Sequence, residues 1–148
     1  MPLREYNVFT KAMQARFPKL LRTWPDTPYN DWGLETPRGW NDLMTRMFEE
    51  LEQVLAPHHD AQDCFQLAQA KSKFACLRVY TDRVPAAVSE QVRAIITKYE
   101  GLCDKACEHT GKPAKTYISK SSGWCCLLAP EIAEHDPDLK PLNQEDGQ

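Results

Sequence analysis

One apolar stripe constrains the fold of this chain more than any other feature of its sequence. Between residues 40 and 55, apolar side chains recur at helical intervals, at Trp40, Leu43, Met44, Met47, Phe48, Leu51, Val54 and Leu55. Pro57 then ends the pattern, because proline cannot continue a helix. We therefore predict a core helix over residues 40–55, whose methionine and aromatic side chains serve packing.

Two further segments have the same helical period. The first runs from Glu5 to Phe17 and is interrupted by Pro18. The second begins near Pro85, a residue suited to a first helical turn, and continues to Ala106. We therefore predict two more amphipathic helices that pack beside the core helix.

Short β-prone runs predict the remaining regular structure. They form two hairpins, the first made of residues 64–68 and 74–80 with 71–73 between them, the second of 116–119 and 123–128. Because side chains alternate along a strand, Leu77 and Val79 are expected on one face of the first hairpin, with Arg78 and Tyr80 on the other. Residues 23–39 hold three prolines and two glycines, which predicts a long loop.

The chain has 148 residues, of which 42% are apolar and 26% charged, and this is enough for one hydrophobic core. The order of the elements predicts an α+β fold, in which two or three amphipathic helices pack on a small antiparallel sheet. We expect one domain over residues 1–135, with a carboxyl-terminal lobe over 107–135. Residues 136–148 are acidic and are expected to form a disordered tail.

No apolar run approaches the length that spans a membrane, and the first residues lack the apolar segment of a signal peptide. We therefore expect a cytoplasmic protein that does not act at a membrane. In the cytoplasm its six cysteines are expected to be reduced thiols, not disulfides.

Several short motifs occur in a fixed order along the chain: Phe17-Pro-Lys-Leu20, Gly39-Trp40, Lys71-x-Lys-Phe-x-x-Leu-Arg-x-Tyr80, Cys107-Glu-x-x-Gly-Lys-Pro113 and Gly123-Trp124. In order and spacing, from about Phe9 to Ala133, the chain resembles a family of small proteins of unassigned function that tailed bacteriophages and prophages encode. The resemblance implies a bacterial host cell as the place of action.

The last third of that family resembles a zinc knuckle, Cys-x-x-Cys-Gly-x-Pro followed by Leu-Cys-x-x-His. In this sequence the four ligand positions fall on Cys107, Thr110, Ala129 and Ile132. Alanine and isoleucine have no lone pair for a metal, and a threonine hydroxyl is a poor substitute for a thiolate. The resemblance therefore implies a degenerate zinc-ribbon-like lobe that holds no cofactor.

A different zinc site is the alternative, because Cys103, Cys107, Cys125 and Cys126 are soft ligands close together in the sequence. Cys103 and Cys107 are one helical turn apart, but no standard zinc pattern joins such a pair to an adjacent Cys-Cys. We therefore favour buried, apolar cysteines over zinc ligands.

No residues of the sequence predict catalysis. Cys107 and His109 are close in sequence, but sequence neighbours rarely form a nucleophile and base pair. The sequence has no glycine-rich phosphate loop, no His-Glu-x-x-His helix and no Gly-x-Ser-x-Gly turn. We therefore expect a protein that is not an enzyme.

The function that we favour is that of a small phage or prophage accessory protein that binds a host or phage protein. The resemblance also suggests an inhibitor of a host defence system such as CRISPR. Trp24, Tyr29 and Trp32 give the 23–39 loop the aromatic composition of protein-binding hot spots, so we predict that they contact the partner. The alternative is that they cover the core. The sequence leaves the oligomeric state open.

A nucleic-acid-binding module is the second hypothesis. Lys71, Lys73 and Arg78 would form a basic face around the first hairpin. The net charge of the chain is -3, which is unlike that of most phosphate-binding domains. This hypothesis predicts binding that weakens steeply as salt is added.

Overall fold

The structure is a computed structural model that describes residues 5–58 and 63–142. Its helices are α1 (Val8–Arg16), α2 (Pro28–Trp32), α3 (Asn41–Leu55), α5 (Ser89–Cys103) and α6 (Pro130–Ala133), with 3-10 turns η1 (Arg38–Trp40) and η2 (Ala86–Val88). Its strands are β1 (Gln66–Lys73), β2 (Cys76–Arg83), β3 (Lys115–Ser119), β4 (Cys125–Leu128) and β5 (Leu139–Pro141). The predicted α+β class is confirmed. Within the described ranges, no helix is both long and apolar enough to cross a membrane.

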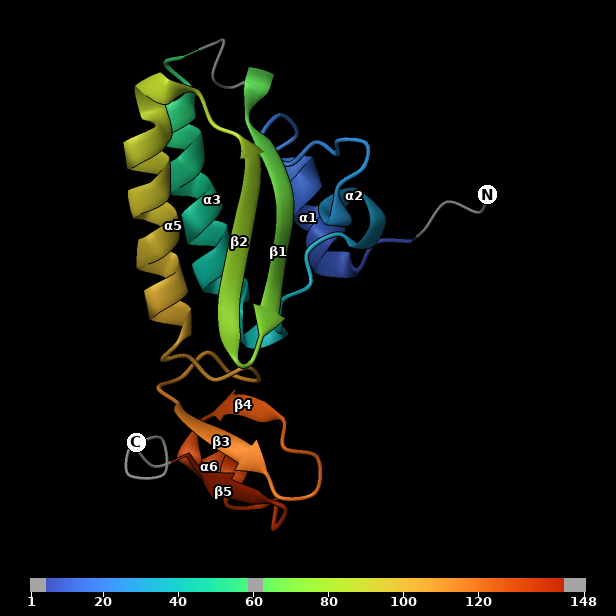
Figure 1. Cartoon of the computed structure of the whole chain (residues 1–148), viewed down its shortest axis with the longest axis vertical. Helices are drawn as coiled ribbons and strands as arrows, with labels where there is room; N and C mark the ends of the chain where they lie inside the picture. Colours follow the sequence, from blue (N-terminus) through green and yellow to red (C-terminus); the bar gives the residue numbers. More distant parts are fainter. Residues whose placement is uncertain (1–4, 59–62, 143–148) are drawn as a thin grey trace.

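The elements are arranged around the β1–β2 hairpin (Figure 1). Helices α3 and α5 pack against each other, and α5 also contacts β2. Helix α2 contacts β1 on the other side of the hairpin. Strands β3, β4 and β5 and helix α6 form a lobe at one end of the molecule, below the hairpin turn in Figure 1.

Helix α3 provides the centre of the main core, as its apolar stripe predicts. The side chains that it buries are Met44, Met47, Phe48, Leu51 and Leu55. The ring of Phe17 meets that of Phe48 edge to face, with 6.0 Å between the ring centres. Burial of each such side chain contributes about 1.5–3 kcal/mol, so this stripe supplies much of the driving force for folding. The predicted helices at 5–17 and 85–106 correspond to α1 and to η2 followed by α5.

The hairpin forms as predicted, but its turn lies further along the chain. Strands β1 and β2 pair as far as Lys73 and Cys76, so the turn residues are Phe74 and Ala75, not 71–73. Both turn residues have positive φ, 54° and 62°, as a two-residue turn between twisted strands requires. The predicted facing is confirmed, because Leu77 is buried while its neighbour Arg78 is exposed.

The segment predicted as a long loop contains two regular features. Helix α2 begins after Thr27, whose Oγ1 accepts a hydrogen bond from the Asn30 N–H at 3.1 Å, with Pro28 at the first helical position. Further on, Glu35 pairs with the free edge of β1: its N–H donates to the Ala70 carbonyl, and its carbonyl accepts from the Ser72 N–H. The prediction missed the helix because five residues carry too little periodicity to reveal one.

The three-stranded sheet of the lobe has the order β4-β3-β5. Strand β5 lies inside the predicted disordered tail, so the prediction is wrong for residues 139–141. Residues 143–148 of that tail lie outside the residues that the structure describes. Asp138 holds this segment in place, because its carboxylate accepts hydrogen bonds from the Ser119 and Ser121 hydroxyls and from the Ser121 N–H. Leu139 then packs on the small core of the lobe. The Asp138 hydrogen bonds and the Leu139 packing therefore order this segment although its composition is acidic.

The lobe joins the main body through close backbone packing. The Gly39 N–H donates to the Glu108 carbonyl at 2.8 Å, and the Trp40 indole N–H donates to the Ala106 carbonyl at 2.9 Å. A side chain at Gly39 would place its Cβ 2.1 Å from the Cys107 carbonyl oxygen. Only glycine leaves room for this approach.

Candidate functional site

The aromatic loop does not form the predicted contact surface. Tyr29 is fully buried, and its hydroxyl donates to the Leu21 carbonyl at 2.6 Å and accepts from the Gln14 side chain at 3.1 Å. Burial raises the pKa of Tyr29 to about 12. A side chain with no exposed surface cannot contact a partner, so the prediction for Tyr29 is wrong: this residue covers the core.

Trp24 and Trp32 have different environments. Trp24 is half-buried, and the Arg22 guanidinium lies 4.5 Å from its ring centre, which is cation–π geometry. Trp32, at the end of α2, is 55% exposed. The three predicted contact residues therefore share one segment of the chain, but only Trp32 presents most of its ring to solvent.

Lys71, Lys73 and Arg78 lie on one face of the β1–β2 hairpin. In the register of the two strands, Lys71 is directly opposite Arg78 and Gln69 is directly opposite Tyr80. These pairs alternate with the inward pairs of the ladder, so Gln69, Lys71, Lys73, Arg78 and Tyr80 share the outward side, which we call the hairpin face. The structure thus brings together the three predicted basic residues.

The cations of the hairpin face repel one another, and an anionic partner would relieve this repulsion. Like charges directly opposite each other on two strands, as Lys71 and Arg78 are, destabilise a hairpin. Tyr80 presents an aromatic ring beside them and is 48% exposed. Two carboxylates border this basic area: Gln69 donates weakly to Glu35 at 3.5 Å, and Asp104 lies beside Cys76, the residue directly opposite Lys73.

Phe74 is a candidate contact residue that the sequence analysis did not predict. It lies at the hairpin turn, is 65% exposed, and has a φ of 54°. A bulky residue in the left-handed region carries a conformational cost on the order of 1 kcal/mol, which asparagine or glycine would avoid. The Lys73 ammonium lies 5.8 Å from the Phe74 ring centre. The sequence signal was the absence of any asparagine or glycine between the two β-prone runs.

Cys107 and the three positions aligned with zinc ligands lie in one small cluster. The Cys107 sulfur accepts hydrogen bonds from the Thr110 hydroxyl and from the backbone N–H groups of His109, Thr110 and Ala129. Burial raises the pKa of this thiol, but the hydrogen bonds together bring it below its ordinary value. Ala129 is buried in the same cluster as Cys107, and Ile132 packs against that cluster.

The other candidate thiols are divided between the main core and the cluster around Cys107. Cys103 is buried in the main core, where burial raises its pKa to about 12, and Cys125 packs against that core. Cys126 packs on the lobe cluster with Cys107, and burial raises its pKa to about 11. Over residues 5–58 and 63–142, no three His, Cys, Asp or Glu side chains assemble as a metal site requires.

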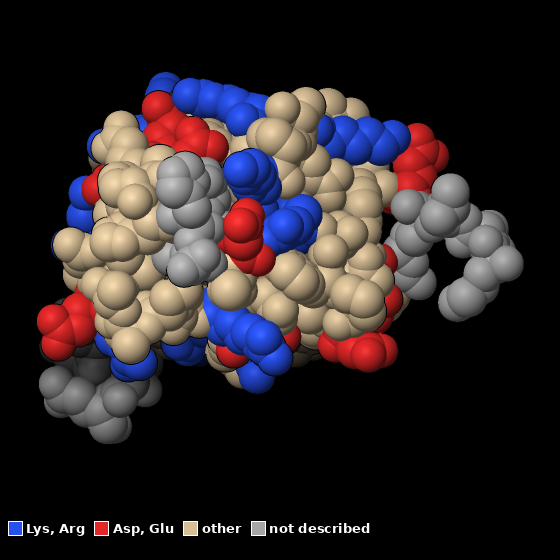
Figure 2. All heavy atoms as spheres, turned by 90° about the horizontal axis from the view of Figure 1, so that it is seen from above, with Lys and Arg blue, Asp and Glu red and all other residues tan. Residues whose placement is uncertain are grey.

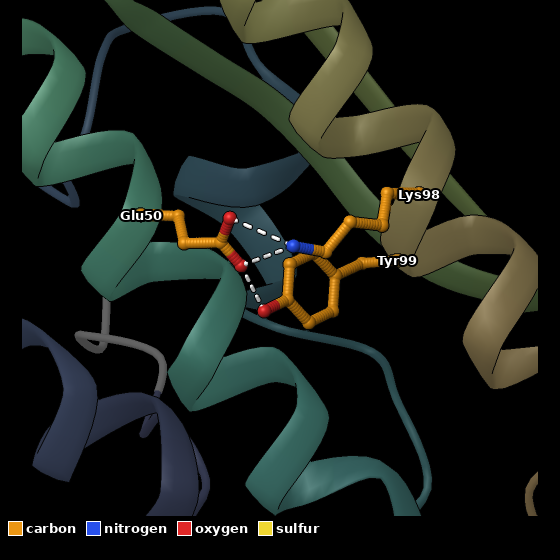
Figure 3. Close-up of polar contacts among 3 residues, drawn as sticks. All are labelled: Glu50, Lys98 and Tyr99. Atoms are coloured by element: carbon orange, nitrogen blue, oxygen red, sulfur yellow. Dashed lines mark hydrogen bonds and ion pairs between the residues drawn. The ribbon is translucent and has the colours of Figure 1, made fainter.

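A polar cluster ties helix α3 to helix α5 (Figure 3). The Glu50 carboxylate accepts a hydrogen bond from the Tyr99 hydroxyl, and the Lys98 ammonium lies 2.9 Å from both of its oxygens. Burial, followed by the carboxylate, raises the pKa of Tyr99 to about 12. The Tyr99 and Lys98 hydrogen bonds in turn lower the pKa of Glu50. These residues line a shallow pocket of 220 Å³, and their mutual pairing indicates a structural role.

This cluster predicts a specific pH dependence. The folded pKa of Glu50 is below its unfolded value of 4.5, so its contribution is present above that pH and is lost as the pH falls through the folded pKa. Tyr99→Phe removes the main cause of the shift and is expected to lower the free energy of unfolding by about 1 kcal/mol near neutral pH, and by less near pH 3. Urea titrations of both proteins at the two pH values measure the difference. An equal loss at both would show that Tyr99 acts through packing alone.

Charged residues of both signs are mixed at the end of the molecule that lies away from the lobe. Figure 2 shows the end away from the lobe, where Lys and Arg side chains lie among Asp and Glu side chains. This view shows no broad area of one charge, in contrast to the cross-strand cations of the hairpin face.

The hairpin face and its turn are therefore the candidate contact site. They combine three cations with two exposed aromatic rings, those of Phe74 and Tyr80. Both belong to the 71–80 segment, one of the five motifs named in the sequence analysis. No family model, curated protein or solved structure matches this chain.

Proposed function

We propose that this chain is a non-enzymatic accessory protein of phage or prophage origin that binds a host or phage protein through the hairpin face and turn. The observation that carries the proposal is the exposed ring of Phe74, held in a left-handed conformation at the hairpin turn. A folded protein retains such strain where the surrounding structure fixes it, and functional sites are where it is commonly found.

The chemistry of the hairpin supports a protein contact. Phe74 would serve as the apolar anchor, because burying one phenylalanine ring contributes about 1.5–3 kcal/mol to binding. Lys73 lies beside the anchor, Lys71 and Arg78 lie further along the same hairpin, and these cations would select an acidic surface. The resemblance favours a bacterial or phage partner, and inhibition of a host defence such as CRISPR is one role for such a complex.

The surroundings of Cys107 support a role without catalysis. Its sulfur has the lowered pKa that a nucleophile needs, but the residue is fully buried. Its partners are a hydroxyl and backbone N–H groups, which donate hydrogen bonds and cannot take up a proton as a general base does. The arrangement favours a thiol that holds the lobe together.

Nucleic-acid binding is the second candidate, and one specific observation favours it. Lys71 and Arg78 lie directly opposite each other beside Tyr80, so cations and an aromatic ring alternate on one ribbon. Proteins that bind single-stranded nucleic acid combine these two features, since backbone phosphates pair with cations and bases stack on rings.

Affinity capture from a nuclease-treated bacterial lysate tests the proposal. The wild-type protein is expected to retain a protein partner, and Phe74→Asn is expected to lose it, because the anchor is gone. Asparagine tolerates positive φ, so the variant should melt at the same temperature as the wild type or slightly higher. Val8→Ser is the matched control, since Val8 is 85% exposed but lies on α1, away from the hairpin.

Two outcomes would contradict the protein-binding proposal. Retention of the same partner by Phe74→Asn would remove the hairpin turn from the interface. The second candidate would be established instead if the protein captured only nucleic acid, and only from lysate without nuclease. That binding should weaken as salt is added and in the double variant Lys71→Gln, Arg78→Gln.

A further inference from the structure

Two half-buried thiols, those of Cys76 and Cys125, lie close together where the lobe meets the main body. Cys76 begins β2 and is directly opposite Lys73, at the turn end of the hairpin. Cys125 begins β4, the strand of the lobe that lies just below this turn in Figure 1. Both are free thiols of intermediate exposure, and Cys125 acts electrostatically on Cys76, which places the two sulfurs near each other.

The alternation of side chains along β4 directs Cys125 toward the main body. Cys125 packs against the main core, and Leu127, two residues further on, is buried in it. Cys126 and Leu128 belong instead to the small core of the lobe. Successive side chains of a strand point to opposite faces, so Cys125 extends out of the lobe and its neighbour does not. Cys125 is therefore the thiol of the lobe that is positioned to reach the body.

The surroundings of Cys76 make it the slower of the two thiols to react with a small molecule. Asp104, the residue that follows α5, lies beside the Cys76 thiol. Burial, followed by this carboxylate, raises the pKa of Cys76. Because the thiolate is the attacking species, a protonated Cys76 reacts slowly until an activated sulfur is held beside it.

We propose that Cys76 and Cys125 form a reversible disulfide that fixes the hairpin turn to the lobe when small disulfides such as oxidised glutathione accumulate. The Cys125 thiolate attacks one sulfur of the small disulfide, which forms a mixed disulfide and releases one glutathione thiolate. The Cys76 thiolate then attacks the Cys125 sulfur and releases the second. The two protons of the protein thiols pass to the released thiolates. The protein therefore loses two electrons and two protons, which reduce one small disulfide to two thiols.

The bond would add a covalent link to a junction that hydrogen bonds and packing hold in the reduced protein. The hydrogen bonds that Gly39 and Trp40 donate to residues 108 and 106 are part of that junction. A disulfide between β2 and β4 closes a long loop and restricts the unfolded chain, so it stabilises the folded protein. The inference goes beyond the proposed function and does not depend on what the hairpin face binds.

Oxidation of the full chain carrying Cys64→Ser tests this inference. The change removes the exposed thiol that precedes β1, at the other end of the hairpin. With oxidised glutathione, the protein is expected to lose two free thiols and to cross-link tryptic peptide 74–78 to the peptide that begins at residue 121. Its melting temperature should rise by roughly 5–10 °C, and dithiothreitol should reverse both changes.

Serine variants in the same background assign the bond. Cys126→Ser is the matched control, because it removes the adjacent thiol that packs in the lobe, and it should form the same cross-link. Cys76→Ser and Cys125→Ser should each form none and show no rise in melting temperature. A cross-link that persists in Cys125→Ser would overturn the inference. So would glutathione retained on Cys125 without a cross-link, or a cross-linked protein that melts no higher than the reduced one. Phe74→Asn keeps both thiols, so it should cross-link normally whether or not it loses a partner.

Discussion

Replacing Gly39 by alanine is expected to lower the free energy of unfolding by about 3 kcal/mol, and the melting temperature by roughly 10 °C. The added Cβ would lie 2.1 Å from the Cys107 carbonyl oxygen and 2.5 Å from the Glu108 carbonyl carbon. Both atoms belong to the backbone, so no side chain can rotate to make room. The Gly39 N–H also donates to Glu108, and a shift that relieves the overlap would weaken this hydrogen bond. Urea and thermal unfolding measure the loss.

Gly101→Ala is the matched control, with the opposite sign. Gly101 lies inside α5, and a Cβ there would meet no atom within 4 Å. Alanine is expected to stabilise the protein by about 0.5–1 kcal/mol, because glycine loses more freedom on forming a helix. If Gly39→Ala were as stable as the wild type, the backbone contact between the η1 segment and residues 107–108 would not hold the lobe on the main body.

The hydrophobic period of the sequence was enough to predict α1, α3, α5 and the β1–β2 hairpin of the main body. The α3 stripe and the alternation of Leu77 with Arg78 both depend on burial, and burial repeats with the geometry of the element. Strand partners and faces follow from the same alternation, so the three basic residues of the hairpin face could be grouped from sequence. The cluster of Glu50, Lys98 and Tyr99 could not, because it depends on how helices α3 and α5 pack against each other.

Features set by single contacts could not be predicted. The turn falls on Phe74 and Ala75 although neither residue favours positive φ, because the facing of the two strands fixes where the chain reverses. Strand β5 forms within an acidic segment because Asp138 caps the Ser119–Ser122 turn. Tyr29 was predicted to contact a partner, but its ring is buried and its hydroxyl donates to the Leu21 carbonyl inside the core. None of these contacts leaves a periodic signal in the sequence.

The cluster around Cys107 has a consequence that can be measured directly. Thr110 and Ala129 both donate hydrogen bonds to the Cys107 sulfur, and Ile132 packs on the same cluster. Thr110→Cys, Ala129→Cys and Ile132→His would thus place three new ligands around an existing thiol whose pKa is already lowered. We expect this triple variant to bind one zinc ion per chain, because three thiolates and an imidazole satisfy tetrahedral zinc. Metal analysis and competition with a chromophoric chelator measure the stoichiometry and the affinity.

Stability tests the same variant independently. Without zinc it should be less stable than the wild type by about 2 kcal/mol, since a histidine replaces the apolar Ile132 side chain. Zinc should then more than restore stability, because metal binding of roughly 10 kcal/mol is coupled to folding of the lobe. A chelator is expected to lower the melting temperature of the triple variant and to leave that of the wild type unchanged. Adding Cys107→Ser should abolish zinc binding, which would assign the metal to this cluster and not to Cys103 or Cys125 in the main core.

A triple variant that folds but binds no zinc would contradict the alignment behind the resemblance. The four positions would then share a core without converging on one point, and the lobe would be an apolar cluster with no relation to a metal site. Zinc binding would instead mean that the lobe keeps the geometry of a zinc knuckle after losing three of its ligands. In that case packing of Ala129 and Ile132 around Cys107 supplies the stability that the metal gives in the family's pattern.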